Sequence, residues 1–171
     1  MKTISKNLPV AFFLATAFIL GTLILPSPIP AAEFKNAAPA FVIEYPDEFV
    51  SDPLQPGDVL RVKHPNGVPG FEIQISDVPE SGPDFDAYGK GYAEALKALG
   101  TDVKILSSKA AQTADGTPAH ETEIEWKWQG TAQLVSLVFV TAKDKKYIAI
   151  GGHTGGDLDP IRDIIETFEL K

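Results

Sequence analysis

The sequence contains no cysteine, a single methionine and no N-x-S/T glycosylation sequon. The lack of cysteine excludes disulfides, thiol catalysis and cysteine-ligated metal sites. It also excludes a lipid-modified N-terminal cysteine, so the protein is not expected to be a lipoprotein. The fold must therefore be stabilised by a hydrophobic core without covalent cross-links, which is feasible for a domain of this length.

Basic side chains are scarce beyond the first 32 residues. That part of the chain carries 13 Lys and Arg against 23 Asp and Glu, a formal net charge of −10. A surface with this charge repels the phosphates of nucleic acids and of anionic bilayers. Nucleic-acid binding is therefore not expected, and membrane contact is expected only through the N-terminal segment, if that segment is not removed.

The N-terminal segment lacks an apolar run of the usual membrane-spanning length. Two lysines precede an uncharged run of 16 residues, Val10–Leu25, whereas a spanning helix needs about 20. Three prolines and the small residues Ala31 and Ala32 follow. This order is typical of a secretory signal peptide over residues 1–32, cleaved after Ala31 or Ala32, and an uncleaved anchor is the alternative. The segment predicts export to a bacterial periplasm or to the extracellular space.

The remaining sequence predicts a short linker over residues 33–40 and one domain over residues 41–171. Period-2 alternation predicts strands, and apolar residues at helical spacing predict two amphipathic helices. Short connections in this order indicate an α+β domain with antiparallel pairing. The predicted strands are Phe41–Tyr45, Val59–Lys63, Phe71–Ser76, Val103–Ala111, Pro118–Trp128, Thr131–Thr141 and Tyr147–Gly151, and the predicted helices are Phe85–Leu99 and a final helix capped by Asp159. Thr131–Thr141 is apolar on both faces, so it is expected to be a central strand covered on both sides.

Four segments resemble bacterial domains similar to PsbP, the extrinsic protein of the oxygen-evolving complex. They are FVIEYPDEF at Phe41–Phe49, GTPAHETEIEW at Gly116–Trp126, KDKKYIAI at Lys143–Ile150 and TFEL at Thr167–Leu170. The resemblance implies the fold of the PsbP and Mog1-like superfamily, an αβα sandwich in which an antiparallel sheet carries helices on both faces. It also implies a non-catalytic accessory or binding role. Some photosynthetic members of the family are associated with calcium or manganese retention.

The most unusual segment is the glycine-rich stretch between the last strand and the last helix. Glycines before a helix can leave backbone amides pointing at an anion, and a histidine here adds a titratable group. One interpretation is therefore a ligand-binding site formed by Gly152, His153, Gly155 and Asp157. The other is a plain strand-to-helix connection, because its aspartates can cap the helix and would repel an anion.

An acidic stretch precedes the first predicted helix. Asp77, Asp84 and Asp86 could offer oxygen ligands, so calcium is a possible cofactor, and no other cofactor is expected. The stretch lacks the D-x-[DN]-x-[DN]-G pattern of an EF-hand, and two prolines restrict its ability to wrap an ion. The alternative is that Asp84 caps the helix and the rest is a solvated loop.

Two tryptophans and one histidine lie on a single predicted strand. Trp126 and Trp128 share a face, which is either a stacking platform for a sugar or partner, or core packing. His120 is expected to be a buried neutral imidazole near Trp126. The sequence contains no H-E-x-x-H zinc motif and no G-x-S-x-G nucleophile motif.

These observations leave three hypotheses for function. The leading one is an exported, non-catalytic accessory or binding module that docks on a cell-envelope protein or complex. The second is a small-ligand or divalent-cation binding protein that uses the glycine-rich or the acidic loop. The third is a hydrolase of the cell envelope that uses His120 or His153.

Overall fold

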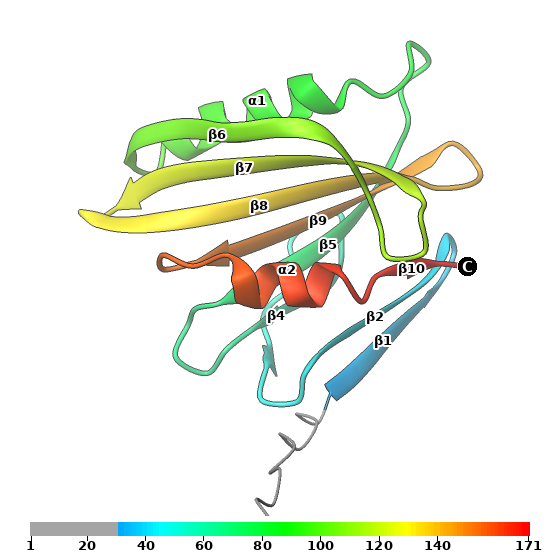
Figure 1. The fold of residues 1–171 in the computed structure, drawn as a ribbon, viewed down its shortest axis with the longest axis horizontal. Helices are drawn as coiled ribbons and strands as arrows, with labels where there is room; N and C mark the ends of the chain where they lie inside the picture. Colours follow the sequence, from blue (N-terminus) through cyan, green and yellow to red (C-terminus); the bar gives the residue numbers. More distant parts are fainter. Residues whose placement is uncertain (1–30) are drawn as a thin grey trace, which may run out of the picture.

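The computed structural model describes residues 31–171, so residues 1–30 of the predicted signal peptide lie outside the described residues. Ten strands and two helices follow one another along the described chain (Figure 1). Within residues 31–171, no helix is both long enough and apolar enough to cross a membrane. The elements are β1 (Ala31–Ala37), β2 (Ala40–Pro46), β3 (Val50–Ser51), β4 (Asp58–Lys63), β5 (Gly70–Asp77), α1 (Phe85–Lys97), β6 (Thr101–Gln112), β7 (Pro118–Trp128), β8 (Thr131–Thr141), β9 (Lys146–Thr154), α2 (Asp159–Ile165) and β10 (Glu169–Leu170).

Seven strands form one antiparallel sheet in the order β3-β4-β5-β9-β8-β7-β6. Successive hairpins join β6 to β7, β7 to β8, and β8 to β9. In these hairpins Ile124 lies opposite Val135, and Val138 lies opposite Ile150. The chain crosses from β5 to the far edge of the sheet through α1, and β9 then returns to lie between β5 and β8. The predicted strand Thr131–Thr141, which is β8, therefore lies inside this sheet between β9 and β7, and β6 is an edge strand.

A second, smaller sheet has the order β1-β2-β10. Its first strand overturns the expected linker over residues 33–40, because Ala31–Ala37 pair with Ala40–Pro46. The ring of Phe34 lies 6.0 Å from that of Phe41, which anchors β1 on the domain. β10 pairs with the opposite side of β2, so the end of the chain closes on the start of the domain.

Apolar side chains form two clusters that share strand β8. Val138 and Val140 belong to the first cluster, whereas Leu137 and Phe139 belong to the second. Because neighbouring side chains of a strand point to opposite faces, the two clusters lie on opposite faces of the main sheet. The prediction that Thr131–Thr141 is covered on both sides is confirmed.

Helix α1 packs on the second cluster through the buried side chains of Ala93 and Leu96. Asp84 caps the helix as predicted, since its Oδ1 accepts a hydrogen bond from the backbone N–H of Ala87 at 2.9 Å. Gly89 allows close approach to β7, because a Cβ at this position would lie 2.7 Å from Oγ1 of Thr122. The helix ends two residues before the predicted Leu99.

Helix α2 packs on the first cluster through Ile161 and Ile164. Its start is stabilised by Asp157, whose Oδ1 accepts a hydrogen bond from the N–H of Asp159 at 3.0 Å. The prediction that Asp159 is the cap is therefore wrong. On β9, Gly152 faces the helix: a Cβ there would lie 2.0 Å from Cγ2 of Ile161. The glycine thus sets how closely α2 can approach the sheet.

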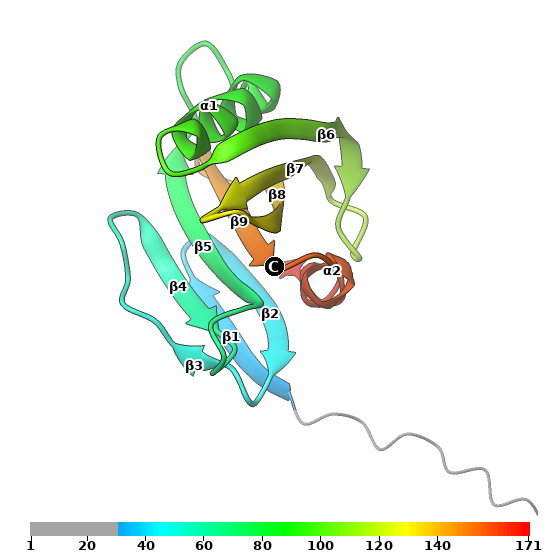
Figure 2. The same cartoon turned by 90° about the vertical axis from the view of Figure 1, so that its left-hand side faces the viewer.

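The α+β class and the antiparallel pairing are confirmed. Strands β7, β8 and β9 lie between α1 and α2 (Figure 2). The layering differs from a simple helix–sheet–helix sandwich, because Phe41 and Ile43 of the small sheet belong to the same cluster as Ile161 and Ile164 of α2. The small sheet and the helix therefore cover this side of the main sheet together.

Gly152→Ala is expected to lower the free energy of unfolding by about 1–3 kcal/mol, because the new methyl group overpacks the buried contact with Ile161. Urea denaturation of the purified protein measures this change. Gly155→Ala is the matched control: the nearest atom to its Cβ is Cγ2 of Val68 at 3.9 Å, so its effect should stay within about 0.5 kcal/mol. Equal stability of the two variants would contradict the packing role assigned to Gly152.

Candidate binding groove beside helix α1

A groove of about 850 Å³ runs beside α1 over the face of the main sheet that carries the second cluster. We call it the α1 groove. One wall is formed by Tyr92 and Leu96 of α1, and by Leu99 just after the helix. Strands β4, β5 and β9 contribute polar side chains, and β7 contributes both tryptophans. The volume lies within the range of small-molecule sites.

Two charged pairs line the groove: Lys63 with Asp52, at 2.5 Å, and Arg61 on β4 with Glu72 on β5. Arg61 and Glu72 are directly opposite each other in the strand register, and Nη1 of Arg61 lies 3.9 Å from Oε2 of Glu72. The Glu72 side chain is only 12 % exposed. Burial raises its pKa to about 7, the positive charge of Arg61 opposes this rise, and the negative charge of Asp58 adds to it.

Arg61 is held in place from behind by Asp58, whose side chain is fully buried. The Asp58 carboxylate accepts hydrogen bonds from Nε of Arg61 at 2.7 Å, from Nε2 of Gln74 at 2.9 Å and from the N–H of Gln55 at 2.7 Å. Burial alone would raise the pKa of Asp58, but these hydrogen bonds outweigh it and hold the pKa below its usual value. The guanidinium therefore has a fixed orientation toward the groove.

His153 and Tyr92 complete the polar part of the groove. Burial, and next the positive charge of Arg61, lower the pKa of His153, so its imidazole is neutral at neutral pH. Burial, and next the charge of Glu72, raise the pKa of Tyr92, so its phenol keeps its proton. Both groups are thus uncharged hydrogen-bonding partners for a bound molecule.

Apolar surface is exposed at the rim of the same groove. Trp128 is 52 % exposed and Leu99 is 68 % exposed. Trp126 packs on the second cluster, and its Nε1 is buried without a hydrogen-bond partner among the described residues. Trp126 is therefore core packing, whereas Trp128 is exposed, and its role as a stacking platform stays a prediction.

The structure divides the predicted ligand residues Gly152, His153, Gly155 and Asp157. Strand β9 continues to Thr154, so Gly152 and His153 lie within the sheet and not in a loop. Gly152 makes room for α2, and Asp157 accepts a hydrogen bond from the N–H of Asp159 at the start of that helix, whose N-cap residue is Leu158. Gly155 lies in the exposed turn between them. Only His153 lines the α1 groove.

The predicted calcium ligands Asp77, Asp84 and Asp86 are each engaged elsewhere. Asp77 pairs with Nζ of Lys146 at 2.6 Å, and Asp84 caps α1. Asp86 accepts a hydrogen bond from Oγ of Ser108. Across residues 31–171, no three His, Asp or Glu side chains are arranged to hold a metal ion.

Sequence spacing did not reveal that Asp86, Ser108 and His120 meet at the start of α1. Nε2 of His120 lies 2.9 Å from Oγ of Ser108 and 3.3 Å from Oδ1 of Asp86. In a catalytic triad the carboxylate and the hydroxyl contact different ring nitrogens. Here both contact Nε2, and the serine hydroxyl donates to the carboxylate. His120 is therefore partly exposed and satisfied by polar neighbours, at the opposite end of β7 from Trp126.

A pH dependence of stability follows from Glu72. Its pKa rises from 4.5 in the unfolded chain to about 7 in the folded protein. The folded state therefore binds the carboxyl proton of Glu72 more tightly than the unfolded chain does. The contribution of this proton to the free energy of unfolding is fully present below pH 4.5 and is lost as the pH rises through 7. Glu72→Gln removes the titration, so the variant should gain about 2–3 kcal/mol relative to the unmodified protein between about pH 4.5 and pH 8.

Urea denaturation at both pH values measures this gain. Glu80→Gln, in the exposed loop before α1, is the control and should show a difference that is independent of pH. If the free energy of unfolding of Glu72→Gln differs from that of the unmodified protein by the same amount at both pH values, the raised pKa of Glu72 is contradicted.

The fold, but not the sequence, has counterparts among known proteins. No family model matches the chain, and no curated protein matches it in sequence. The solution structure of cyanobacterial PsbP (CyanoP) from Synechocystis sp. PCC 6803 is similar with a TM-score of 0.64 and 14 % identity, over 89 % of this chain and 99 % of that one.

Two further structures share the architecture. The Ran-binding protein Mog1p of Saccharomyces cerevisiae has a TM-score of 0.58 and 8 % identity, over 83 % of this chain and 96 % of that one. LpqN of Mycobacterium tuberculosis, described as involved in cell envelope biogenesis, has a TM-score of 0.53 and 14 % identity, over 85 % and 87 %. At these identities the similarity extends to the fold alone. The chain therefore shares its fold with PsbP and Mog1p, the fold that the resemblance of its sequence segments implied.

Proposed function

We propose that this chain is an exported accessory or binding module that docks on a protein or complex of the cell envelope through the α1 groove. The observation that carries the proposal is that an exposed apolar rim lies beside an ordered polar floor. Trp128 and Leu99 are exposed beside the fixed Arg61–Glu72 pair. Protein interfaces typically combine an aromatic anchor with desolvated polar groups in this way.

The fold neighbours support a binding role. Mog1p is described as a Ran-binding protein, and LpqN as involved in cell envelope biogenesis. Export rests on the predicted signal peptide of residues 1–32. A non-catalytic role is favoured because the Asp86–Ser108–His120 group lacks the arrangement of a triad.

A small-ligand binding protein is the second candidate. It is favoured by one specific observation, the buried Nε1 of Trp126 that has no partner within residues 31–171. A ligand acceptor near this donor would satisfy it, since a buried N–H without a partner costs about 1–3 kcal/mol. The titratable Glu72 and the neutral His153 would then select a polar ligand.

Trp128→Ala is expected to reduce docking by at least about 10-fold, because exposed aromatic anchors dominate interface energies. The test uses a photo-crosslinking amino acid at position 129, on the groove rim, in cells that naturally make the protein. The expected result is one discrete crosslinked species in the envelope fraction, with a yield that falls strongly in Trp128→Ala.

Leu106→Ala is the matched control, because Leu106 is 44 % exposed on the edge strand β6 and does not line the groove. It should leave the crosslink yield unchanged. An equal loss in both variants, or no discrete crosslink from position 129, would contradict docking through the groove. A small bound molecule in place of a crosslinked protein would favour the second candidate.

A further inference from the structure

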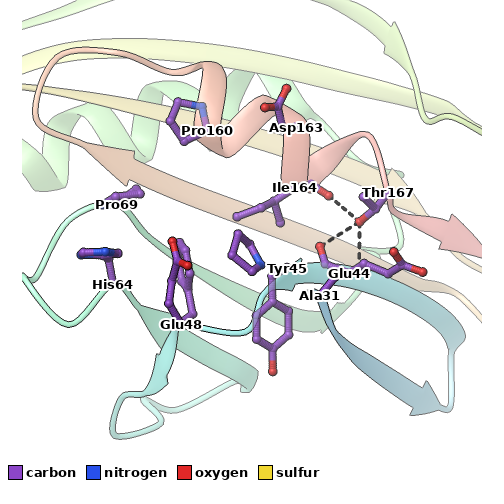
Figure 3. A pocket seen from close by; sticks show the side chains of 12 residues that line it. Ala31, Glu44, Tyr45, Glu48, His64, Pro69, Pro160, Asp163, Ile164 and Thr167 are labelled. Carbon is purple, nitrogen blue, oxygen red and sulfur yellow. Dashed lines mark hydrogen bonds between the residues drawn. The ribbon is translucent and has the colours of Figure 1, made fainter. Parts of the chain in front are cut away.

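A second hollow lies beside α2, on the face of the main sheet opposite the α1 groove. It has a volume of about 520 Å³ and is bounded by the end of β2, the loops around β3 and β4, and α2 (Figure 3). We call it the α2 pocket. Its residues Tyr45, Phe49 and Ile164 pack with the first cluster, whereas Trp126 and Leu96 of the α1 groove pack with the second. The two hollows therefore lie over different clusters, and the loop between β4 and β5 borders both.

The floor of the α2 pocket is apolar and fixed by the core. The ring of Tyr45 lies 5.5 Å from that of Phe71, and the ring of Phe49 lies 6.1 Å from the same buried ring. Ile164 is 3 % exposed and anchors the α2 side. Three prolines, Pro46, Pro69 and Pro160, complete the apolar surface. An occupant would find a preformed surface for an apolar group, which reduces the entropic cost of binding.

Two uncharged polar atoms of the α2 pocket, Oγ1 of Thr167 and Nδ1 of His64, already have partners. Oγ1 of Thr167 contacts the carbonyl of Ile164 at 2.7 Å and the carbonyl of Glu44 at 3.0 Å, and it accepts from the N–H of Glu44 at 2.8 Å (Figure 3). Nδ1 of His64 accepts a hydrogen bond from the N–H of Asn66 at 3.2 Å. These groups add little recognition of their own, so apolar contact and charge must select the occupant.

The charge around the α2 pocket has one sign. Glu44, Glu48 and Asp163 line it, all three are exposed, and none forms an ion pair with another residue of the described chain. No Lys or Arg within residues 31–171 lines the pocket. Other carboxylates of the domain, such as Glu72 and Asp159, do have basic partners. The rim of the pocket thus lacks the positive charge that would complement it.

From this geometry we infer that the α2 pocket binds a short segment of a protein partner in which an apolar side chain is flanked by Lys or Arg. The apolar side chain fills the pocket over Tyr45, Phe49 and Ile164, and the basic side chains meet Glu48, Glu44 and Asp163. Opposite charges across an interface favour encounter and fix the register of the bound chain. The acidic rim repels lipid phosphates, so a bilayer is not the occupant. This site is separate from the α1 groove and does not depend on the docking function proposed for it.

The test is a titration of the protein with a fluorescein-labelled peptide that has a central leucine and two lysines on either side. Fluorescence anisotropy measures the affinity at low ionic strength, and amide chemical shifts locate the peptide. The expected result is binding with shifts concentrated at Tyr45, Phe49 and Thr167. Replacing the leucine by serine should weaken binding at least about 10-fold, because the apolar contact is lost.

The double variant Glu48→Gln with Asp163→Asn should weaken peptide binding by about 3- to 10-fold, as expected for two exposed charge pairs. The control double variant Glu80→Gln with Asp144→Asn removes the same total charge at exposed sites that do not line the pocket. It should leave the affinity unchanged. Thermal unfolding of both variants shows whether they remain folded.

Several outcomes would overturn the inference. Equal weakening by both double variants would mean that only the net charge of the domain attracts the peptide. Equal binding of the leucine and serine peptides would mean that the apolar floor is not used. An affinity for hexylamine as high as for the peptide would assign the pocket to a small amphipathic amine, and no binding at all would leave the pocket without this function.

Discussion

The burial of strand β8 on both faces is the constraint on which the rest of the structure depends. Six consecutive residues, Val135–Val140, are buried. Their alternating side chains contribute to both hydrophobic clusters, so this strand links the two. A domain without disulfides needs such a shared element, because all of its stability must come from burial. Helix α1 on one face of β8, and α2 with the small sheet on the other face, therefore belong to one folding unit.

Unequal covering of the two faces explains where the binding surfaces lie. On one face a single helix, α1, packs mainly over β6 and β7. The neighbouring part of that face, with Glu72 and Arg61, is left as a groove. On the other face α2 and the small sheet cover the core together, and the α2 pocket forms where the two meet. Both hollows are thus by-products of how a small domain closes its core.

The central strands and the helix positions could be predicted from sequence because each follows one clear physical rule. Pro118–Trp128 and Thr131–Thr141 match β7 and β8 to the residue. Alternation works there because strand side chains take opposite faces. Strand β1 could not be found in this way, since its small residues gave no apolar signal. β3 and β10 have only two residues each, too few to show any period.

The binding groove was harder to predict, and two of its residues show why. Glu72 alternates with Phe71 and Ile73, a pattern typical of a strand with only one face buried. The structure buries this carboxyl because α1 and β4 enclose it, and neither neighbour is visible from local pattern. Gly152 was assigned to a ligand loop because glycines cluster there. A glycine is needed at this position because Ile161 of α2 lies against it. This contact joins residues of two different elements, and local sequence spacing does not reveal it.

Native-state hydrogen exchange of the purified protein in low urea tests most directly whether β8 unites the domain. Amides that pair β7 with β8 lie beside the second cluster, and those that pair β5 with β9 lie beside the first. If both clusters depend on β8, the two sets of amides should open with the same free energy, within about 1 kcal/mol, and with the same urea dependence. Opening of one set at a clearly lower free energy, while the other stays protected, would show two separable units and contradict the account.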